Sequence, residues 1–230
     1  MTGLFIAFAL FVLLHSMPAI PAIRAGIIGR VGRPVYFAGY STVSTALLVW
    51  LFYETLNTDY IELWEPARWQ ATATFILAPL GLFLVIAGLI SFNPFSVTLR
   101  RETGAQGAIV NVTRHPVLWG FAFWALGHVL PNGDLRSLIL FGGFAVFALG
   151  GIAMAERRAR KRLGGDWQGT TKGSAIIPLQ ALLLRQCRFR IDRPMLIGAI
   201  ITAVTTLCLL HGGHALLVGT DPIATLQSLG

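Results

Sequence analysis

Long apolar stretches alternate with short polar ones along almost the whole chain. Six of them have the apolar character of membrane helices: Gly3–Met17, Val35–Leu56, Trp69–Ile90, Pro116–Leu130, Leu135–Ala155 and Pro194–Val218. A bilayer core takes about 20 residues of helix, so the first and fourth stretches need thinned lipid or shielding by other helices. The pattern predicts an all-α, polytopic transmembrane bundle of about six spans that forms a single domain over residues 1–230.

The ends of these stretches carry signals that stop and start helices. Pro18 and Pro21 break the first helix, and Pro116 stands at the first helical position of the fourth, where its missing N–H costs nothing. The turn of residues 131–134 ends the fourth stretch and supplies Asp134 as a cap for the next helix. The fifth stretch passes directly into a basic segment, which predicts a surface helix on the cytoplasmic side.

Composition and charge agree with a membrane protein. Of the 230 residues 55% are hydrophobic and only 12% are charged, with a mean hydropathy of +0.69, a balance that soluble domains do not show. The net charge of +8 comes from Arg and Lys concentrated in alternate loops, as the positive-inside rule requires. This distribution places both termini on the non-cytoplasmic side of a bacterial inner membrane and explains the basic excess without nucleic-acid binding.

The start of the chain and the two cysteines bear on processing, disulfide bonds and covalent haem attachment. No Lys or Arg precedes the first apolar run and no small-residue cleavage site follows it, so we expect a retained helix rather than a signal peptide. Cys187 and Cys208 lie in reducing or apolar surroundings, and no disulfide is expected. Neither belongs to a CxxC or CxxCH motif, which excludes covalent attachment of haem.

Candidate chemistry rests on histidines in apolar surroundings. Thirteen residues of helix place His115 and His128 on nearly opposite faces and roughly 20 Å apart, so one helix cannot offer both to a single metal. The face of His128 also carries Gly120, Trp124 and Gly127, and this slot suits a flat cofactor. The alternative is that the glycines let a neighbouring helix approach closely and that His128 hydrogen-bonds across the bundle.

Three further histidines lie near the ends of spans. His15, at the cytoplasmic end of the first span, is a functional candidate because ionisable residues inside membranes usually serve a function; an interfacial residue bonded to the backbone is the alternative. His211 and His214 lie toward the outer end of the last span, where exposure to water explains His211 best. The chain has no P-loop, GxGxxG, HExxH or nucleophile elbow, so phosphoryl transfer and hydrolysis have no support.

With its histidines, its helix-breaking prolines and the turn of residues 131–134, the chain resembles the NnrU family of bacterial membrane proteins. That family is associated with nitric oxide and nitrite metabolism and is related to 15-cis-zeta-carotene isomerase. Four parts of the chain carry the resemblance. They are His15 with the Pro- and Arg-containing segment after it, the stretch 114–134 with its two histidines and the Asn-Gly-Asp turn, the block Leu163–Pro178, and the tail His214–Pro222.

The resemblance implies a noncovalent haem b between helices, whose iron loses one protein ligand on reduction and can then act on a polyene double bond. Carried over to this chain, the ligands are His15 and His128, and His115 is a further important residue. Neutral imidazoles bind iron readily. If the haem stands upright in the membrane, the pairs become His15 with His115 or His128 with His214. The other residues placed at the cofactor are Trp124, Gly120, Gly127 and His214.

Three classes of function stay open. The leading one is a haem-binding NnrU-type protein that isomerises a carotenoid-like polyene or takes part in nitric oxide and denitrification metabolism. The second is a membrane methyltransferase that uses S-adenosylmethionine and resembles isoprenylcysteine carboxyl methyltransferase, with Arg114 and His115 at the cofactor and Glu156 ending the next span. The third is a noncatalytic partner without cofactor. The expected partners are the lipid bilayer, a small apolar or gaseous ligand and a second copy of the chain.

Overall fold

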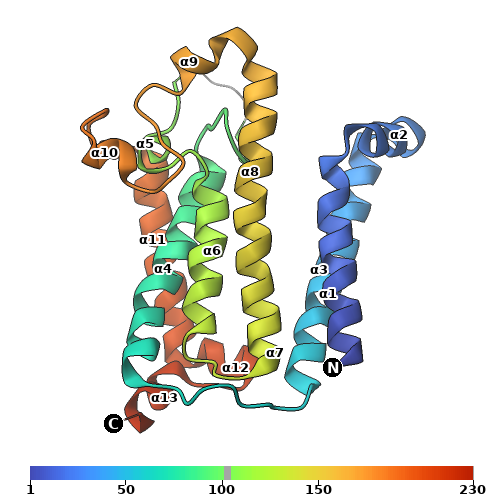
Figure 1. Cartoon of the computed structure of the whole chain (residues 1–230), viewed down its shortest axis with the longest axis vertical. Coiled ribbons are helices and arrows are strands. Elements are labelled where there is room, and N and C mark those ends of the chain that lie inside the picture. The colour runs from blue at the N-terminus through green and yellow to red at the C-terminus, as the bar shows by residue number, and fades with distance from the viewer. Residues whose placement is uncertain (101–104, 230) are drawn as a thin grey trace. The chain divides into compact units, whose positions relative to one another are not determined.

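The computed structural model describes residues 1–100 and 105–229, and within them every regular element is a helix (Figure 1). The only extended pairing in this part of the chain is an isolated bridge between Glu62 and Asp134. The predicted all-α class is therefore confirmed. The chain divides into two compact units, Met1–Leu63 with Asp134–Leu140 and Trp64–Gly133 with Phe141–Gly230.

The first unit contains two packed helices and their connection. Its elements are α1 (Thr2–Ser16), η1 (Met17–Ala19), α2 (Pro21–Val31), α3 (Arg33–Asn57) and α7 (Leu135–Ser137). As predicted, the chain leaves the first helix just before Pro18 and begins a new one at Pro21. Helix α1 packs against α3, and Leu4 and Ala7 on α1 are fully buried.

The second unit is a bundle of four long helices with short ones at its ends. The helices are α4 (Arg68–Ile90), α6 (Pro116–Val129), α8 (Gly143–Leu163) and α11 (Arg193–Cys208), with α5 (Ile109–Val112), α9 (Trp167–Thr170), α10 (Gln180–Leu183), α12 (His214–Val218) and α13 (Pro222–Ser228). Within the bundle α4 packs against both α6 and α11, and α6 packs against α8 (Figure 1).

Helices α4 and α6 approach each other with almost no side chain between them. A Cβ built on Gly81 would lie 2.5 Å from the Gly120 carbonyl oxygen, and one on Gly120 would lie 2.5 Å from the Gly81 oxygen. One on Gly88 would lie 2.8 Å from Val117. These glycines allow backbones to approach closely, as small residues do between membrane helices.

The number of long spans is lower than predicted. Four helices of the described chain are long and apolar enough to cross a bilayer: Arg33–Asn57, Arg68–Ile90, Leu135–Thr170 and Arg193–Val218. Helices α1 and α6 are apolar but have only 15 and 14 residues. At 1.5 Å per residue each is roughly 22 Å long, short of a hydrocarbon core of about 30 Å.

The predicted helix ends are largely confirmed. Pro116 is the first residue of α6, and the Asp134 carboxylate accepts a hydrogen bond from the Ser137 backbone N–H at 3.0 Å. Helix α8 runs on to Leu163, as expected for a span that continues into a surface helix. The last predicted span, Pro194–Val218, is found as Arg193–Val218. Its backbone leaves the helical conformation at His211 and at Gly212, whose φ of +103° suits glycine.

Candidate functional site

A buried polar cluster lies at the N-terminal end of α6. Arg114 and His115 immediately precede Pro116, and both reach Glu156 on the neighbouring helix α8. Arg114 Nη2 lies 3.2 Å from Glu156 Oε1, and His115 Nε2 lies 2.8 Å from Oε2. His115 is fully buried, while the side chains of Arg114 and Glu156 are 13% and 19% exposed. One carboxylate therefore binds two neighbouring residues, one with each oxygen.

Aromatic rings and backbone hydrogen bonds hold Arg114 in place. Its guanidinium lies over the rings of Phe95 and Trp167, at 5.8 and 5.6 Å from their centroids, as in cation–π contacts. The backbone N–H of Arg114 donates to the Ala175 carbonyl at 2.9 Å, and the Asn93 side-chain amide donates to the Arg114 carbonyl at 3.0 Å. Three separate segments of the chain thus fix the position of this charge.

His115 is held as a neutral ring. Burial lowers the pKa of His115 below its usual value, and Arg114 acts in the same direction, while the hydrogen bond to Glu156 opposes them. In the neutral ring Nε2 carries the proton that it donates to Glu156. Nδ1 is buried without a hydrogen-bond partner in the described chain. The cluster therefore presents one buried lone pair.

His128, near the C-terminal end of α6, has the opposite arrangement. Its Nδ1–H donates to the Trp124 carbonyl at 2.7 Å, and Nε2 has no hydrogen-bond partner among the described residues. The ring lies between the rings of Trp124 and Phe141, whose centroids are 4.8 and 5.0 Å away. A hydrogen bond at Nδ1 that leaves Nε2 with its lone pair is the arrangement found in histidines that ligate metals.

The slot predicted beside His128 is occupied by helix α4. A Cβ on Gly120 would meet the backbone of Gly81, and one on Gly127 would lie 3.0 Å from Leu77 Cβ. The interpretation of Gly120 and Gly127 as cofactor contacts is therefore corrected to helix packing, because the backbone of α4 fills the space that a flat ring needs. Trp124 does lie against His128, as predicted.

His15 belongs to the first unit and has the same tautomer as His128. Its Nδ1–H donates to the Phe11 carbonyl at 2.8 Å, and Nε2 accepts a hydrogen bond from the Ser44 hydroxyl at 2.8 Å. The ring stacks on Phe11 with 3.9 Å between the ring centroids, and the centroid of the Tyr40 ring lies 6.1 Å away in an edge-on contact. His15 and His128 lie in different units, and their pairing on one haem stays a prediction.

The two C-terminal histidines differ in their contacts. His214 Nδ1–H donates to the Thr220 carbonyl at 2.7 Å. His211 is exposed at the break between α11 and α12, which agrees with its interpretation as a residue in contact with water.

The described histidines stand singly and not in a metal-binding group. In the described part of the chain no three His, Cys, Asp or Glu side chains are grouped to hold a metal. A porphyrin supplies four ligands itself and asks one or two from the protein. His128 is one such donor, fixed through Nδ1 with its lone pair on Nε2, whereas the Nε2 of His15 accepts the hydrogen bond from Ser44.

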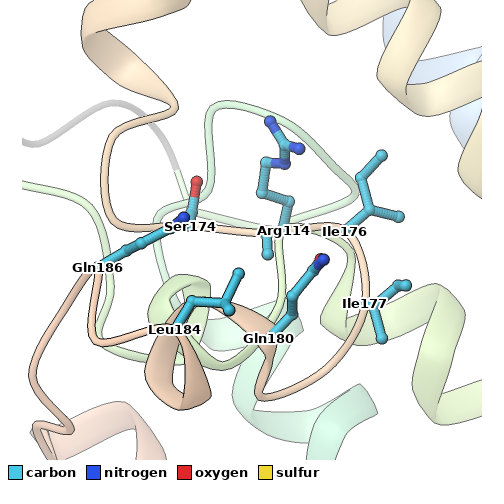
Figure 2. Close-up of a pocket in the computed structure, with 8 residues that line it drawn as sticks. Arg114, Ser174, Ile176, Ile177, Gln180, Leu184 and Gln186 are labelled. Atoms are coloured by element: carbon cyan, nitrogen blue, oxygen red, sulfur yellow. The ribbon is translucent and has the colours of Figure 1, made fainter.

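A cavity of about 520 Å³ opens beside Arg114. Figure 2 shows Gln180, the first residue of α10, and Leu184, directly after that helix, facing the segment 174–177 across it. Its lining is mixed, with the aliphatic Ile176 and Ile177 next to amide and hydroxyl groups. In the sequence this segment stands out only as part of the family resemblance, and no pattern there predicts the cavity.

The contact of Glu156 with Arg114 and His115 was also not predicted. The available signal for Glu156 was its place in the sequence, at the end of the span that follows an Arg-His-Pro motif. The contacts of Phe95 and Trp167 with Arg114 had no signal, because Phe95 lies in a loop and Trp167 begins α9, far apart in the chain.

Comparison with known proteins places the chain in a family. Its residues 3–222 match the model of the NnrU protein family. It is 26% identical to the chloroplastic 15-cis-zeta-carotene isomerase of Arabidopsis thaliana over 75% of its length, and 24% identical to that of Zea mays over 76%. The chain spans 48% of the length of each relative, and no solved structure matches it. Since the family model covers almost all of its 230 residues, this membrane-helix protein belongs to the NnrU family.

Proposed function

We propose that this protein binds haem b noncovalently and isomerises double bonds in an apolar, carotenoid-like polyene. The observation that carries the cofactor is the anchoring of His128, whose Nδ1–H is bonded to the Trp124 carbonyl while Nε2 keeps its lone pair. The reaction is supported by the two relatives named as 15-cis-zeta-carotene isomerases.

His15 and His128 are the proposed ligands, and the protein around them fixes both rings. Trp124 and Phe141 restrict the ring of His128, and Ser44 and Phe11 restrict that of His15. A bound haem supplies an iron whose coordination changes with its redox state. His115 is not a proposed ligand, because its ring is sealed from the surface and its Nε2 donates to Glu156.

The visible spectrum of the purified full chain tests the cofactor. The oxidised protein in detergent is expected to show a six-coordinate, low-spin haem spectrum that changes on reduction. His15→Ala and His128→Ala should each abolish it, and His211→Ala, at an exposed site, should leave it intact. Loss in His214→Ala together with a native spectrum in His15→Ala assigns the pair to His128 and His214 instead. A folded, colourless protein contradicts the proposal.

The reaction is tested separately with 15-cis-zeta-carotene, the compound in the relatives' names. The reduced, haem-loaded protein is expected to convert it to a second geometric isomer with the same mass, which chromatography resolves. If the protein binds haem but leaves the polyene unchanged, and its reduced spectrum responds to nitric oxide, the function lies in nitrogen-oxide handling.

A second candidate is favoured by the cluster around Glu156. Arg114 lines the cavity and shares the Glu156 carboxylate with His115. In a methyltransferase that uses S-adenosylmethionine, Arg114 and His115 would lie at the cofactor's polar end. Such enzymes usually have tyrosines after the Arg-His-Pro motif, and this chain has none after Tyr60. If the purified protein has no haem spectrum and calorimetry shows that it binds S-adenosylmethionine, the result supports this second candidate over the haem protein.

We also propose a location and an orientation. All six apolar helices, α1 and α6 included, cross the inner membrane of a bacterium, and both termini lie on the non-cytoplasmic side. The support is the charge distribution, because all Arg and Lys residues except Arg68 and Arg136 fall in alternate loops.

A further inference from the structure

Four of the five histidines, all except the exposed His211, fall into two classes by the ring nitrogen that donates. In His15, His128 and His214 it is Nδ1, which lies 2.8, 2.7 and 2.7 Å from a backbone carbonyl oxygen. A carbonyl only accepts, so the proton of each neutral ring sits on Nδ1 and the lone pair on Nε2. In His115 the nitrogen with an acceptor is Nε2, at 2.8 Å from Glu156 Oε2. Its lone pair is therefore on Nδ1.

Arg114 holds the Glu156 carboxylate in a fixed orientation toward His115. Its Nη2 takes the second carboxylate oxygen at 3.2 Å, and its guanidinium is held over Phe95 and Trp167. Since Arg114 can only donate, both oxygens of Glu156 act as acceptors. The ring nitrogen that faces Glu156 must then carry a hydrogen.

The consequence is a buried acceptor at the start of α6. His115 is 0% exposed, and its Nδ1 has no hydrogen-bond partner in the described chain. Three other buried polar atoms also lack hydrogen-bond partners in the described chain. One is Nε of the preceding residue, Arg114, and the others are the hydroxyl oxygens of Ser91 and Ser96, which follow the end of α4. Buried polar atoms in folded proteins are nearly always satisfied by protein, by ordered water or by a ligand.

We propose that Glu156 and Arg114 are positioning residues that hold His115 in the Nε2-protonated tautomer, so that its buried Nδ1 accepts a hydrogen bond from an enclosed O–H donor. This gives His115 a role different from that of His15 and His128. Those two offer Nε2 to a metal, whereas His115 offers Nδ1 to a hydroxyl group or a water. The inference does not depend on haem, and it applies to the protein without any cofactor.

Nitrogen NMR of the histidine side chains tests it directly. The full chain carrying His211→Gln, which removes the exposed fifth histidine, is labelled with ¹⁵N-histidine and placed in lipid nanodiscs without haem. It is expected to give one histidine with the proton on Nε2 and three with the proton on Nδ1 at neutral pH. His115→Gln identifies the single opposite signal by its loss. A His115 with the proton on Nδ1, or with both nitrogens protonated at neutral pH, overturns the proposal.

Glu156→Gln gives the sharper result, because it should invert the tautomer. Arg114 can only donate, so the glutamine oxygen is expected to face Arg114 and its NH₂ to face His115. The His115 Nε2 must then accept, and its proton moves to Nδ1. Glu65→Gln, at an exposed site on the segment between α3 and α4, is the matched control and should leave every histidine signal in place.

An unchanged His115 tautomer in a folded Glu156→Gln protein overturns the positioning role. If that variant does not fold, the proposal is tested by the tautomer of His115 in the wild-type protein, where a proton on Nδ1 overturns it. Magnetisation transfer from water to His115 Nδ1 identifies a water as the donor, and a hydrogen-bonded Nδ1 without such transfer identifies a hydroxyl of a bound molecule. A chemical shift typical of a free lone pair at Nδ1 overturns the acceptor role.

Discussion

In a chain this apolar, the chemistry of a histidine depends on which of its two nitrogens is already bonded. His15 and His128 both donate from Nδ1 to a carbonyl four residues earlier in their own helix. This bond needs no partner from elsewhere, and it leaves Nε2 directed outward from the helix backbone. His115 precedes its helix and takes its partner from α8 instead. The different roles proposed for these residues follow from that local difference.

Removal of the Glu156 carboxylate should destabilise the fold. Glu156→Ala leaves Arg114 and the His115 Nε2–H without their acceptor in a largely buried place, and breaking such a pair costs about 3 kcal/mol. Thermal unfolding in detergent, followed by circular dichroism, should show a clearly lower midpoint. Glu65→Ala removes an exposed carboxylate and should change the midpoint little. Equal midpoints for the two variants would exclude a stabilising role for the cluster.

The same cluster predicts a pH dependence. The pKa of His115 is lower in the folded protein than its usual value of 6.5, because burial and Arg114 outweigh Glu156. The folded state therefore binds fewer protons at this site than the unfolded chain. The stabilisation is present above pH 6.5 and is lost as the pH falls through the lower, folded pKa. The unfolding midpoint should drop more between pH 7 and pH 5 in the wild type than in His115→Gln, and equal drops would contradict the prediction.

At the scale of elements, helix bounds followed from the sequence but helix neighbours did not. The stretch predicted as Trp69–Ile90 is α4 at Arg68–Ile90, and the one predicted from Pro116 is α6, because prolines and apolar run lengths are local signals. The glycine face of α6 was compatible with a cofactor and with a helix. Periodicity gives the face of a helix but not what lies against it, and α4 is what the structure places there.

The contact between α4 and α6 should therefore tolerate no added methyl group. In Gly120→Ala the new Cβ would lie 2.5 Å from the Gly81 oxygen and 2.8 Å from the Val85 nitrogen, and both are backbone atoms that cannot turn aside. We expect a loss of about 1–3 kcal/mol, which exceeds the gain of up to about 1 kcal/mol in helix propensity. Gly150→Ala on α8 has the same gain and no atom within 4 Å, and should be neutral or stabilising. Resistance to thermal unfolding ranks the two variants, and the reverse order would contradict this packing.

At the scale of the molecule, the hydropathy pattern predicted the class of fold but not the site. The cluster joins Phe95, Arg114, Glu156 and Trp167, which lie in four separate segments. No local signal connects them, because the rotation of α8 that turns Glu156 toward α6 is set by packing along both helices. The sequence supplied the right residue types in Arg114, His115 and Glu156, and the fold supplied their contact.

The short helix α6 decides the arrangement of the whole chain in the membrane. Between Asp59, which follows α3, and Leu183 in α10 lie two long helices, α4 and the one that contains α8, and also α6. If only the long helices cross, Asp59 and Leu183 lie on the same side of the membrane. If α6 crosses too, the number of crossings is three and they lie on opposite sides.

Cysteine labelling distinguishes the two arrangements. Asp59→Cys and Leu183→Cys, each in a chain with both native cysteines replaced by serine, put a thiol at an exposed site. We expect a membrane-impermeant maleimide to label residue 59 in intact spheroplasts and residue 183 only in inverted vesicles, because the basic residues around α10 remain on the cytoplasmic side. Labelling of both from one side would mean that α6 does not cross. It would then be buried among α4 and α8 as a short helix, and His128 would no longer lie at the end of the helix opposite the cytoplasm.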